Sequence, residues 1–301
     1  MRHMRTVGII LLAFAPAVRL SAQSTWNNPE FRDAVGAAAK QVIQALCDHA
    51  SLPERKVCAE VEFRITVGAA QISLNPESIA TPGERTVDIP DLWFRRFLMT
   101  NEAMVIEHYL QKPGFMREYV LYVASQRDQN AVKFPSEYAN FTPEQTAGLM
   151  KDAQGKSQWI IFDGGLTFLL AHEFAHQLEP PDPPGIAFDC VKQQQKESAA
   201  DEKAIQYMLV LGEPPVGGVP TLLFDYYTNE ERLSKDHTRP YESERIRLLE
   251  QATLDNLDRF RDLIADRGQT VEQVRASLTN GVKKLDAEIA SLPLAMCLPS
   301  Q

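Results

Sequence analysis

The chain has 301 residues, of which 44% are hydrophobic and 24% are charged, the proportions of an ordinary globular protein. This length suits one large domain or two small ones. The formal net charge of −9 argues against nucleic acid or an anionic membrane surface as a partner. No segment from residue 23 onward has the roughly 18 continuous apolar residues that a membrane-spanning helix needs.

Residues 1–22 have the features of an export signal. Arg2 and Arg5 give a positive start, residues 6–18 form an apolar core too short to span a bilayer, and Ala22 offers a small-residue cleavage site. An uncleaved N-terminal anchor is the alternative. Cleavage after Ala22 removes three arginines and no acidic residue, which takes the formal charge from −9 to −12. The pattern predicts a periplasmic or secreted protein with no stable membrane span.

The four cysteines are Cys47, Cys58, Cys190 and Cys297. An even number in an exported protein predicts disulfides, and four cysteines allow three pairings. The short loop between Cys47 and Cys58 is the easiest to close. Cys190 and Cys297 would then form the second bridge, although Cys190 can also be interpreted as a metal ligand or a plain buried thiol.

The first elements after the signal are a helix and a small sheet. Asn28 and Pro29 are typical of a helix start, and apolar residues recur at helical spacing over residues 30–49. Residues 61–67 alternate between apolar and polar side chains, which predicts a strand. Residues 86–90 are a second short strand candidate, and turn signals lie between the two.

The rest of the chain predicts helices, with a strong proline-rich break at residues 180–185. We expect helices over residues 92–110, 115–126, 159–178, 196–211, 241–266 and 271–292, and a further short helix opening at Thr142. The predicted fold class is therefore α+β and mainly helical, with a small sheet. Residues 23–301 are predicted to form a single domain, in which residues 92–158 are a helical insertion of unknown role.

The motif His172-Glu173-Phe174-Ala175-His176 carries the functional prediction. Side chains four residues apart stand on one face of a helix, so both imidazoles can reach one metal ion. Glu173 points to the side of that face, where it can meet a metal-bound water and act as general base. A solvated helix with exposed histidines is the alternative. It fits poorly, because residues 165–171 are apolar and buried polar groups need partners.

A catalytic zinc ion takes three protein ligands and leaves one position for water. The first candidate for the third ligand is Glu197, 21 residues beyond His176, on the next predicted helix. Asp201 shares a helix face with Glu197, so one can bind the metal while the other orients an imidazole. Asp182 and Cys190 are weaker candidates. The simpler alternative for Glu197 and Asp201 is a solvated helical face.

This constellation resembles the gluzincin metallopeptidases, specifically the CAAX prenyl endopeptidase family and its soluble bacterial relatives. Residues 75–89 are similar to that family's Thr-Pro-Gly and edge-strand segment, and residues 236–246 resemble its late His-Pro segment followed by Arg-Ile. The resemblance implies a zincin-like domain in which His172, His176 and Glu197 bind zinc and Glu173 is the general base. It also implies that Asp201 supports the ligands from behind. His237 and Arg245 would lie near the site and assist either the oxyanion or the support of the ligands.

Two departures from the family pattern stand out. His237 and Pro240 are separated by two residues where the family has them adjacent, so a surface histidine remains an alternative for His237. The resemblance also leaves residues 92–158 unexplained. A strand near residues 86–89 could pair with an extended peptide if it lay at an exposed edge beside the zinc helix, or could be an ordinary core strand.

The sequence thus predicts an exported zinc metalloendopeptidase acting on a protein or peptide substrate. Glu173 is the expected general base, and His237 or Arg245 is expected to steady the oxyanion. Two alternatives remain open. One is a zinc-stabilised binding or chaperone module without turnover, and the other is a zinc amidase that acts on cell-wall material.

Overall fold

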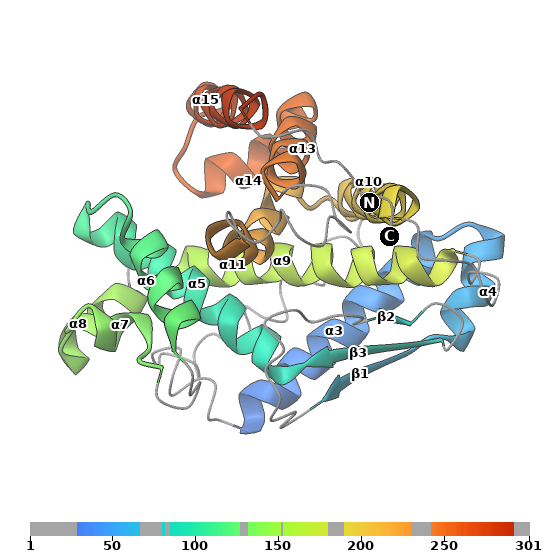
Figure 1. The fold of residues 1–301 in the computed structure, drawn as a ribbon, viewed down its shortest axis with the longest axis horizontal. Helices are drawn as coiled ribbons and strands as arrows, with labels where there is room; N and C mark the ends of the chain where they lie inside the picture. Colours follow the sequence, from blue (N-terminus) through green and yellow to red (C-terminus); the bar gives the residue numbers. More distant parts are fainter. Residues whose placement is uncertain are drawn as a thin grey trace, which may run out of the picture.

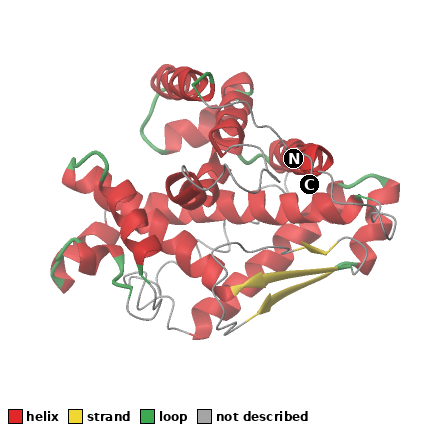
Figure 2. Cartoon of the chain, in the orientation of Figure 1, coloured by secondary structure: helices red, strands yellow, loops and turns green. Residues whose placement is uncertain are grey.

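The computed structural model describes residues 29–66, 80–81, 85–126, 132–151, 153–179, 190–229 and 242–291. It is mainly helical with one small sheet, as predicted (Figures 1 and 2). The helical elements are α3 (Pro29–His49), α4 (Leu52–Glu60), α5 (Asp91–Leu110), α6 (Phe115–Ser125), α7 (Pro135–Tyr138), α8 (Pro143–Lys151), α9 (Ala153–Leu178), α10 (Cys190–Leu211), η2 (Pro215–Gly218), α11 (Val219–Asn229), α13 (Glu242–Asp255), η3 (Leu257–Phe260), α14 (Arg261–Asp266) and α15 (Val271–Ile289).

The long helix α9 runs through the middle of the molecule, with α3 and the sheet on one side and α10, α11 and α13 on the other (Figure 1). Its apolar run accounts for this position, because Leu166, Leu170 and Phe174 are fully buried. Each is four residues from the next, so they lie along one face of the helix. The helix that carries the histidine motif is therefore the structural centre of the fold.

A close backbone contact fixes one side of α9. A Cβ atom added to Gly164 would lie 2.9 Å from the Cα atom of Gly217 in η2, so both positions need glycine for this approach. On the next residue, a Cβ at Gly165 would overlap the ring of Phe97 in α5. The two adjacent glycines thus let η2 and α5 pack directly onto the backbone of α9.

The sheet has the strand order β1-β3-β2, where β1 is Glu62–Thr66, β2 is Ala80–Thr81 and β3 is Thr86–Pro90. β1 is parallel to β3, and β2 is antiparallel to it. Both predicted strands are confirmed, but the possibility that the strand at residues 86–89 is an exposed edge is wrong. β3 is the central strand, and its Val87 and Ile89 are buried in the core. β2 is an edge strand and lies against α9.

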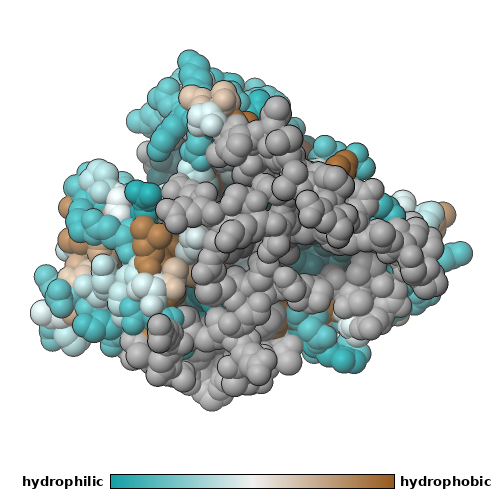
Figure 3. Space-filling view, in the orientation of Figure 1, coloured by the Kyte–Doolittle hydropathy of each residue, from teal (hydrophilic) through white to brown (hydrophobic). Residues whose placement is uncertain are grey.

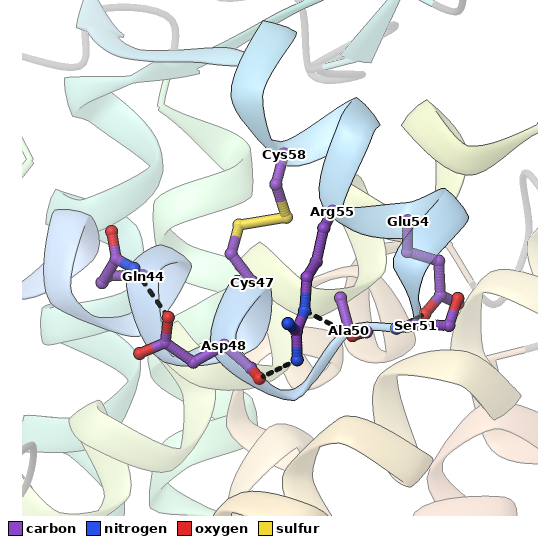
Figure 4. The surroundings of a disulfide bond; sticks show 8 residues. All are labelled: Gln44, Cys47, Asp48, Ala50, Ser51, Glu54, Arg55 and Cys58. Atoms are coloured by element: carbon purple, nitrogen blue, oxygen red, sulfur yellow. Dashed lines mark hydrogen bonds between the residues drawn. A yellow bond between two sulfur atoms is a disulfide. The ribbon is translucent and has the colours of Figure 1, made fainter.

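A disulfide between Cys47 and Cys58 joins the end of α3 to α4 (Figure 4). The same corner is fixed by Arg55, whose guanidinium donates hydrogen bonds to the carbonyl oxygens of Ala50 and Asp48, both at 3.0 Å (Figure 4). This is the pairing that the short loop favoured. Cys297 lies outside the described residues, as does the side chain of Cys190, so the second bridge stays a prediction.

The helices predicted in the insertion at residues 92–158 are present as α5, α6 and α8. Their apolar side chains join the same core cluster as those of α3, α9 and α10, with Tyr119, Phe134 and Leu149 among its buried members. The Tyr119 hydroxyl donates a hydrogen bond to the Lys133 carbonyl oxygen at 2.9 Å, which ties α6 to the chain before α7. The insertion is built onto the central core of the protein.

The C-terminal region differs from its prediction around Asn256. The continuous helix expected over residues 241–266 breaks at Asn256 into α13, η3 and α14. The break turns Leu257 and Phe260 inward, where they form a second small core with Ile264 and Leu278. α15 buries one apolar face as its pattern predicted, and the described surface around it is mostly hydrophilic (Figure 3). η2 and α11 were not predicted.

In the part of the chain that the structure describes, none of the helices combines the length and apolar character needed to cross a membrane.

Candidate metal centre

His172 and His176 lie one turn apart on α9, with their Nε2 atoms 3.1 Å from each other. Glu197 reaches them from α10: its Oε2 is 3.4 Å from Nε2 of His172, and its Oε1 is 3.5 Å from Nε2 of His176. One ligand atom from each of the three residues lies within 4.8 Å of the others. This group can hold a metal ion. The three residues that sequence reasoning selected as ligands are therefore brought together.

Small residues let the two helices approach closely. Ala171 and Ala175 on α9 and Ala200 and Ala204 on α10 are all buried, at exposed fractions of 5% or less. Because α10 packs so tightly onto α9, the Glu197 carboxylate is held at the histidines with only 5% of the residue exposed.

Glu173 is also buried, at 7% exposed, although it lies next to a ligand. Its negative charge acts on both His172 and His176 and raises the pKa of each. Glu173 is thus a buried carboxylate close enough to both imidazoles for its charge to act on them.

Asp201 lies behind His172. Its Oδ1 is 2.8 Å from Nδ1 of His172, so the ring nitrogen on the far side from Glu197 is hydrogen-bonded. Arg245 of α13 donates to Asp201 from Nε at 2.7 Å and from Nη2 at 2.9 Å. Of the two roles that the resemblance implied for Arg245, these contacts favour support of the His172 ring, through Asp201, over stabilisation of an oxyanion.

Two carboxylates at the site were missed from the sequence. Glu242 accepts a hydrogen bond from Nη1 of Arg245 at 3.2 Å, and Glu179 has its Oε1 3.6 Å from Nδ1 of His176. Both are three residues from their partner, a spacing that brings side chains together on a helix and could have indicated them.

The site favours positive charge. Burial acts to lower the pKa of His176, but Glu179, Glu197 and Glu173 together raise it to about 10. The pKa of His172 is likewise raised, since hydrogen bonds with Asp201 and Glu197 outweigh burial. Burial acts against the charge of Asp201, yet Arg245 and His172 hold its pKa well below its usual range.

The buried charged side chains around the histidines also favour added positive charge at the site. Glu173, Glu197, Asp201 and Glu242 are buried there, and the buried cation Arg245 pairs with Asp201 and Glu242. Buried carboxylates are stabilised by nearby cations. A divalent ion among His172, His176 and Glu197 would supply two positive charges, so the donor set and the charge both fit a metal.

The remaining sequence candidates cannot be placed. His237 and Asp182 lie outside the described residues, and the side chain of Cys190 does as well. The chain matches no protein-family model, no curated protein and no solved structure.

Proposed function

We propose that this protein is an exported zinc metallopeptidase with a zincin-like fold. The observation that carries the proposal is the convergence of His172, His176 and Glu197 at one buried point, with Glu173 beside them. Two imidazoles and one carboxylate form a donor set found at catalytic zinc sites, which keep a fourth position open for water. A closed structural site has no need of a neighbouring base.

When bound, zinc would supply a Lewis acid that polarises a substrate carbonyl and makes a water molecule more acidic. Glu173 accepts a proton from the attacking water as its oxygen bonds to the carbonyl carbon. Glu173 then delivers a proton to the amine nitrogen as the carbon–nitrogen bond breaks. Asp201 keeps the His172 ring oriented throughout, and Arg245 keeps Asp201 ionised.

We favour an internal peptide bond of a protein as the substrate, because the sequence resembles endopeptidases. The signal-like N-terminus is consistent with an enzyme that acts outside the cytoplasm. The test is the variant Glu173→Gln, which keeps the shape of the side chain and removes the base. Zinc content, measured by atomic absorption, should stay near one per chain. Cleavage of casein should fall at least a hundredfold, within the usual contribution of a general base.

Two outcomes would redirect the proposal. Cleavage of peptidoglycan without cleavage of casein would identify a cell-wall amidase at the same site. If the parent binds zinc but hydrolyses neither substrate, and Glu173→Gln retains full biological activity, the protein is a zinc-stabilised binding module. His237 is included as a separate variant, because a role in steadying the oxyanion predicts a lower kcat with little change in zinc content.

A further inference from the structure

Each histidine of the candidate centre has a carboxylate at the ring nitrogen that faces away from the other histidine. For His172 that nitrogen is Nδ1, with Asp201 at 2.8 Å. For His176 it is also Nδ1, with the Oε1 of Glu179 at 3.6 Å. The Nε2 atoms of both rings point to the shared ligand position. Each ring therefore has a carboxylate at its Nδ1 atom, and the two carboxylates come from different parts of the chain.

The backbone places Glu179 for this contact. Glu179 follows directly after Leu178, the last residue of α9, and its N–H donates a hydrogen bond to the carbonyl oxygen of His176 at 3.3 Å. The turn that ends the helix thus returns the glutamate to the histidine one turn earlier. Because this hydrogen bond holds the two backbones at a fixed separation, the distance between the Glu179 carboxylate and the His176 ring varies only through side-chain rotation.

The second oxygen of Glu179 faces the other metal-binding helix. Its Oε2 lies 4.0 Å from Nζ of Lys196, the residue directly before Glu197 on α10. Glu179 thus contacts the ring of one ligand and the neighbour of another. This matches the arrangement around Asp201, which meets His172 on one side and the cation Arg245 on the other.

The two supports differ in exposure. The side chain of Asp201 is 3% exposed and that of Arg245 is 7% exposed, whereas Glu179 is 20% and Lys196 is 16% exposed. The pair at His172 is sealed in the interior, while the pair at His176 reaches solvent. Substitution of Glu179 should therefore leave the fold intact and change the site alone.

We propose that Glu179 is a positioning residue for His176. Its carboxylate accepts a hydrogen bond from Nδ1–H of His176, so that Nε2 stays directed at the metal. The proposal rests on the proposed function, since it requires His176 to bind zinc. Carboxylates in this relationship to a metal-binding histidine fix the ring orientation and raise the basicity of the ligand. Loss of such a group lowers metal affinity by about 10–100-fold.

The experiment measures zinc affinity of the purified full chain by competition with a chromophoric chelator. Glu179→Ala should weaken zinc binding by about 10-fold or more. Glu179→Gln should recover part of the loss, because its amide oxygen still accepts from Nδ1–H. Glu202→Ala is the matched control: Glu202 lies on the exposed face of α10, so the same charge is removed without contact to a ligand.

A second measurement separates positioning from general loss of structure. With Co²⁺ in place of zinc, the visible d–d absorption reports the ligand geometry directly. Glu179→Ala should shift this band, while its far-UV circular dichroism and metal-free thermal midpoint stay those of the parent. The Glu202→Ala spectrum should match the parent.

Equal zinc affinity and equal Co²⁺ spectra in the parent and Glu179→Ala would overturn the proposal while leaving the proposed function in place. An equal loss in Glu179→Ala and Glu202→Ala would also overturn it, because the effect would then be one of net charge. A parent that binds neither zinc nor cobalt would overturn the proposed function, and this proposal with it.

Discussion

Arg245 donates hydrogen bonds of 2.7 and 2.9 Å to the two carboxylate oxygens of Asp201. Both side chains are buried, with 7% of Arg245 and 3% of Asp201 exposed. A two-point contact of this kind fixes the plane of the carboxylate as well as its position. Asp201 can then present Oδ1 to the His172 ring at 2.8 Å. The orientation of the His172 ring is thus set from α13, an element far along the chain from α9.

This pair predicts a large stability cost for Arg245→Met. The variant removes the guanidinium that Asp201 and Glu242 share, and removing one partner of a buried ion pair typically costs about 3–5 kcal/mol. Urea unfolding of the metal-free protein measures the change. Arg247→Met is the matched control on the same helix, since its partner Asp286 is 49% exposed and such surface pairs contribute about 1 kcal/mol or less.

The sequence predicted one half of this arrangement, the contact between Asp201 and an imidazole. The spacing of Glu197 and Asp201 placed both on one face of a helix, so support of an imidazole by Asp201 followed from local geometry. The Arg245 contact joins residues 44 positions apart. No local pattern states which element will supply a cation to a buried carboxylate, and only the family resemblance brought Arg245 near the site.

Glu197→Ala should abolish tight metal binding while leaving both histidines in place. The parent should gain stability from zinc by an amount that grows with the free ion, about 2.7 kcal/mol at 100 times the dissociation constant. The variant should show no such gain at the same concentration. Thermal unfolding with and without zinc gives the comparison, and metal analysis after gel filtration checks it. A variant that keeps stoichiometric zinc would show that another residue supplies the third ligand.

Gly164→Ala tests the close packing of η2 onto α9, the helix that carries His172 and His176. Alanine is the better helix former by about 1 kcal/mol, but here its Cβ would lie 2.9 Å from a backbone atom of Gly217. The backbone cannot move aside as a flexible side chain can, so we expect net destabilisation of about 1–3 kcal/mol. Gly148→Ala on α8 is the control. Among the described residues, no atom other than those of its chain neighbours and its own helix backbone lies within 4 Å of the added Cβ, and this variant should be neutral or slightly more stable.

Periodicity predicted most helices, because apolar spacing decides which face a helix buries. It failed where contacts between distant parts of the chain determine the local structure. The chain around Asn256 keeps a helical pattern on both sides, yet breaks there so that Leu257 and Phe260 can fill a second core. The strand at residues 86–89 was recognised, but its central place in the sheet depends on pairing with β1 and β2, which an alternating pattern does not encode.

The ion pair between Glu54 and Lys203 predicts a pH-dependent contribution to stability. The two side chains are 2.6 Å apart and join α4 to α10, the helix that carries Glu197. Burial acts to raise the pKa of Glu54, but the hydrogen bond from Lys203 and those from Ser51 outweigh it and lower the pKa from 4.5 to about 2. A carboxyl with a lowered pKa stabilises the folded protein above its unfolded value, and the contribution is lost as the pH falls.

Glu54→Gln should therefore be less stable than the parent at pH 7, by about 1 kcal/mol, because 33% of the Lys203 side chain is exposed and solvent screens the pair. The difference should narrow as the pH falls from 4.5 towards 2, where the parent also loses the charge. Glutamine can still accept the Ser51 N–H bond of the helix cap, so the comparison isolates the charge. Urea unfolding over this pH range, with Lys203→Met and the double variant completing the cycle, measures the coupling. A gap between parent and Glu54→Gln that stays constant down to pH 2 would assign the loss to packing, since only the ionised carboxylate can produce a difference that vanishes on protonation.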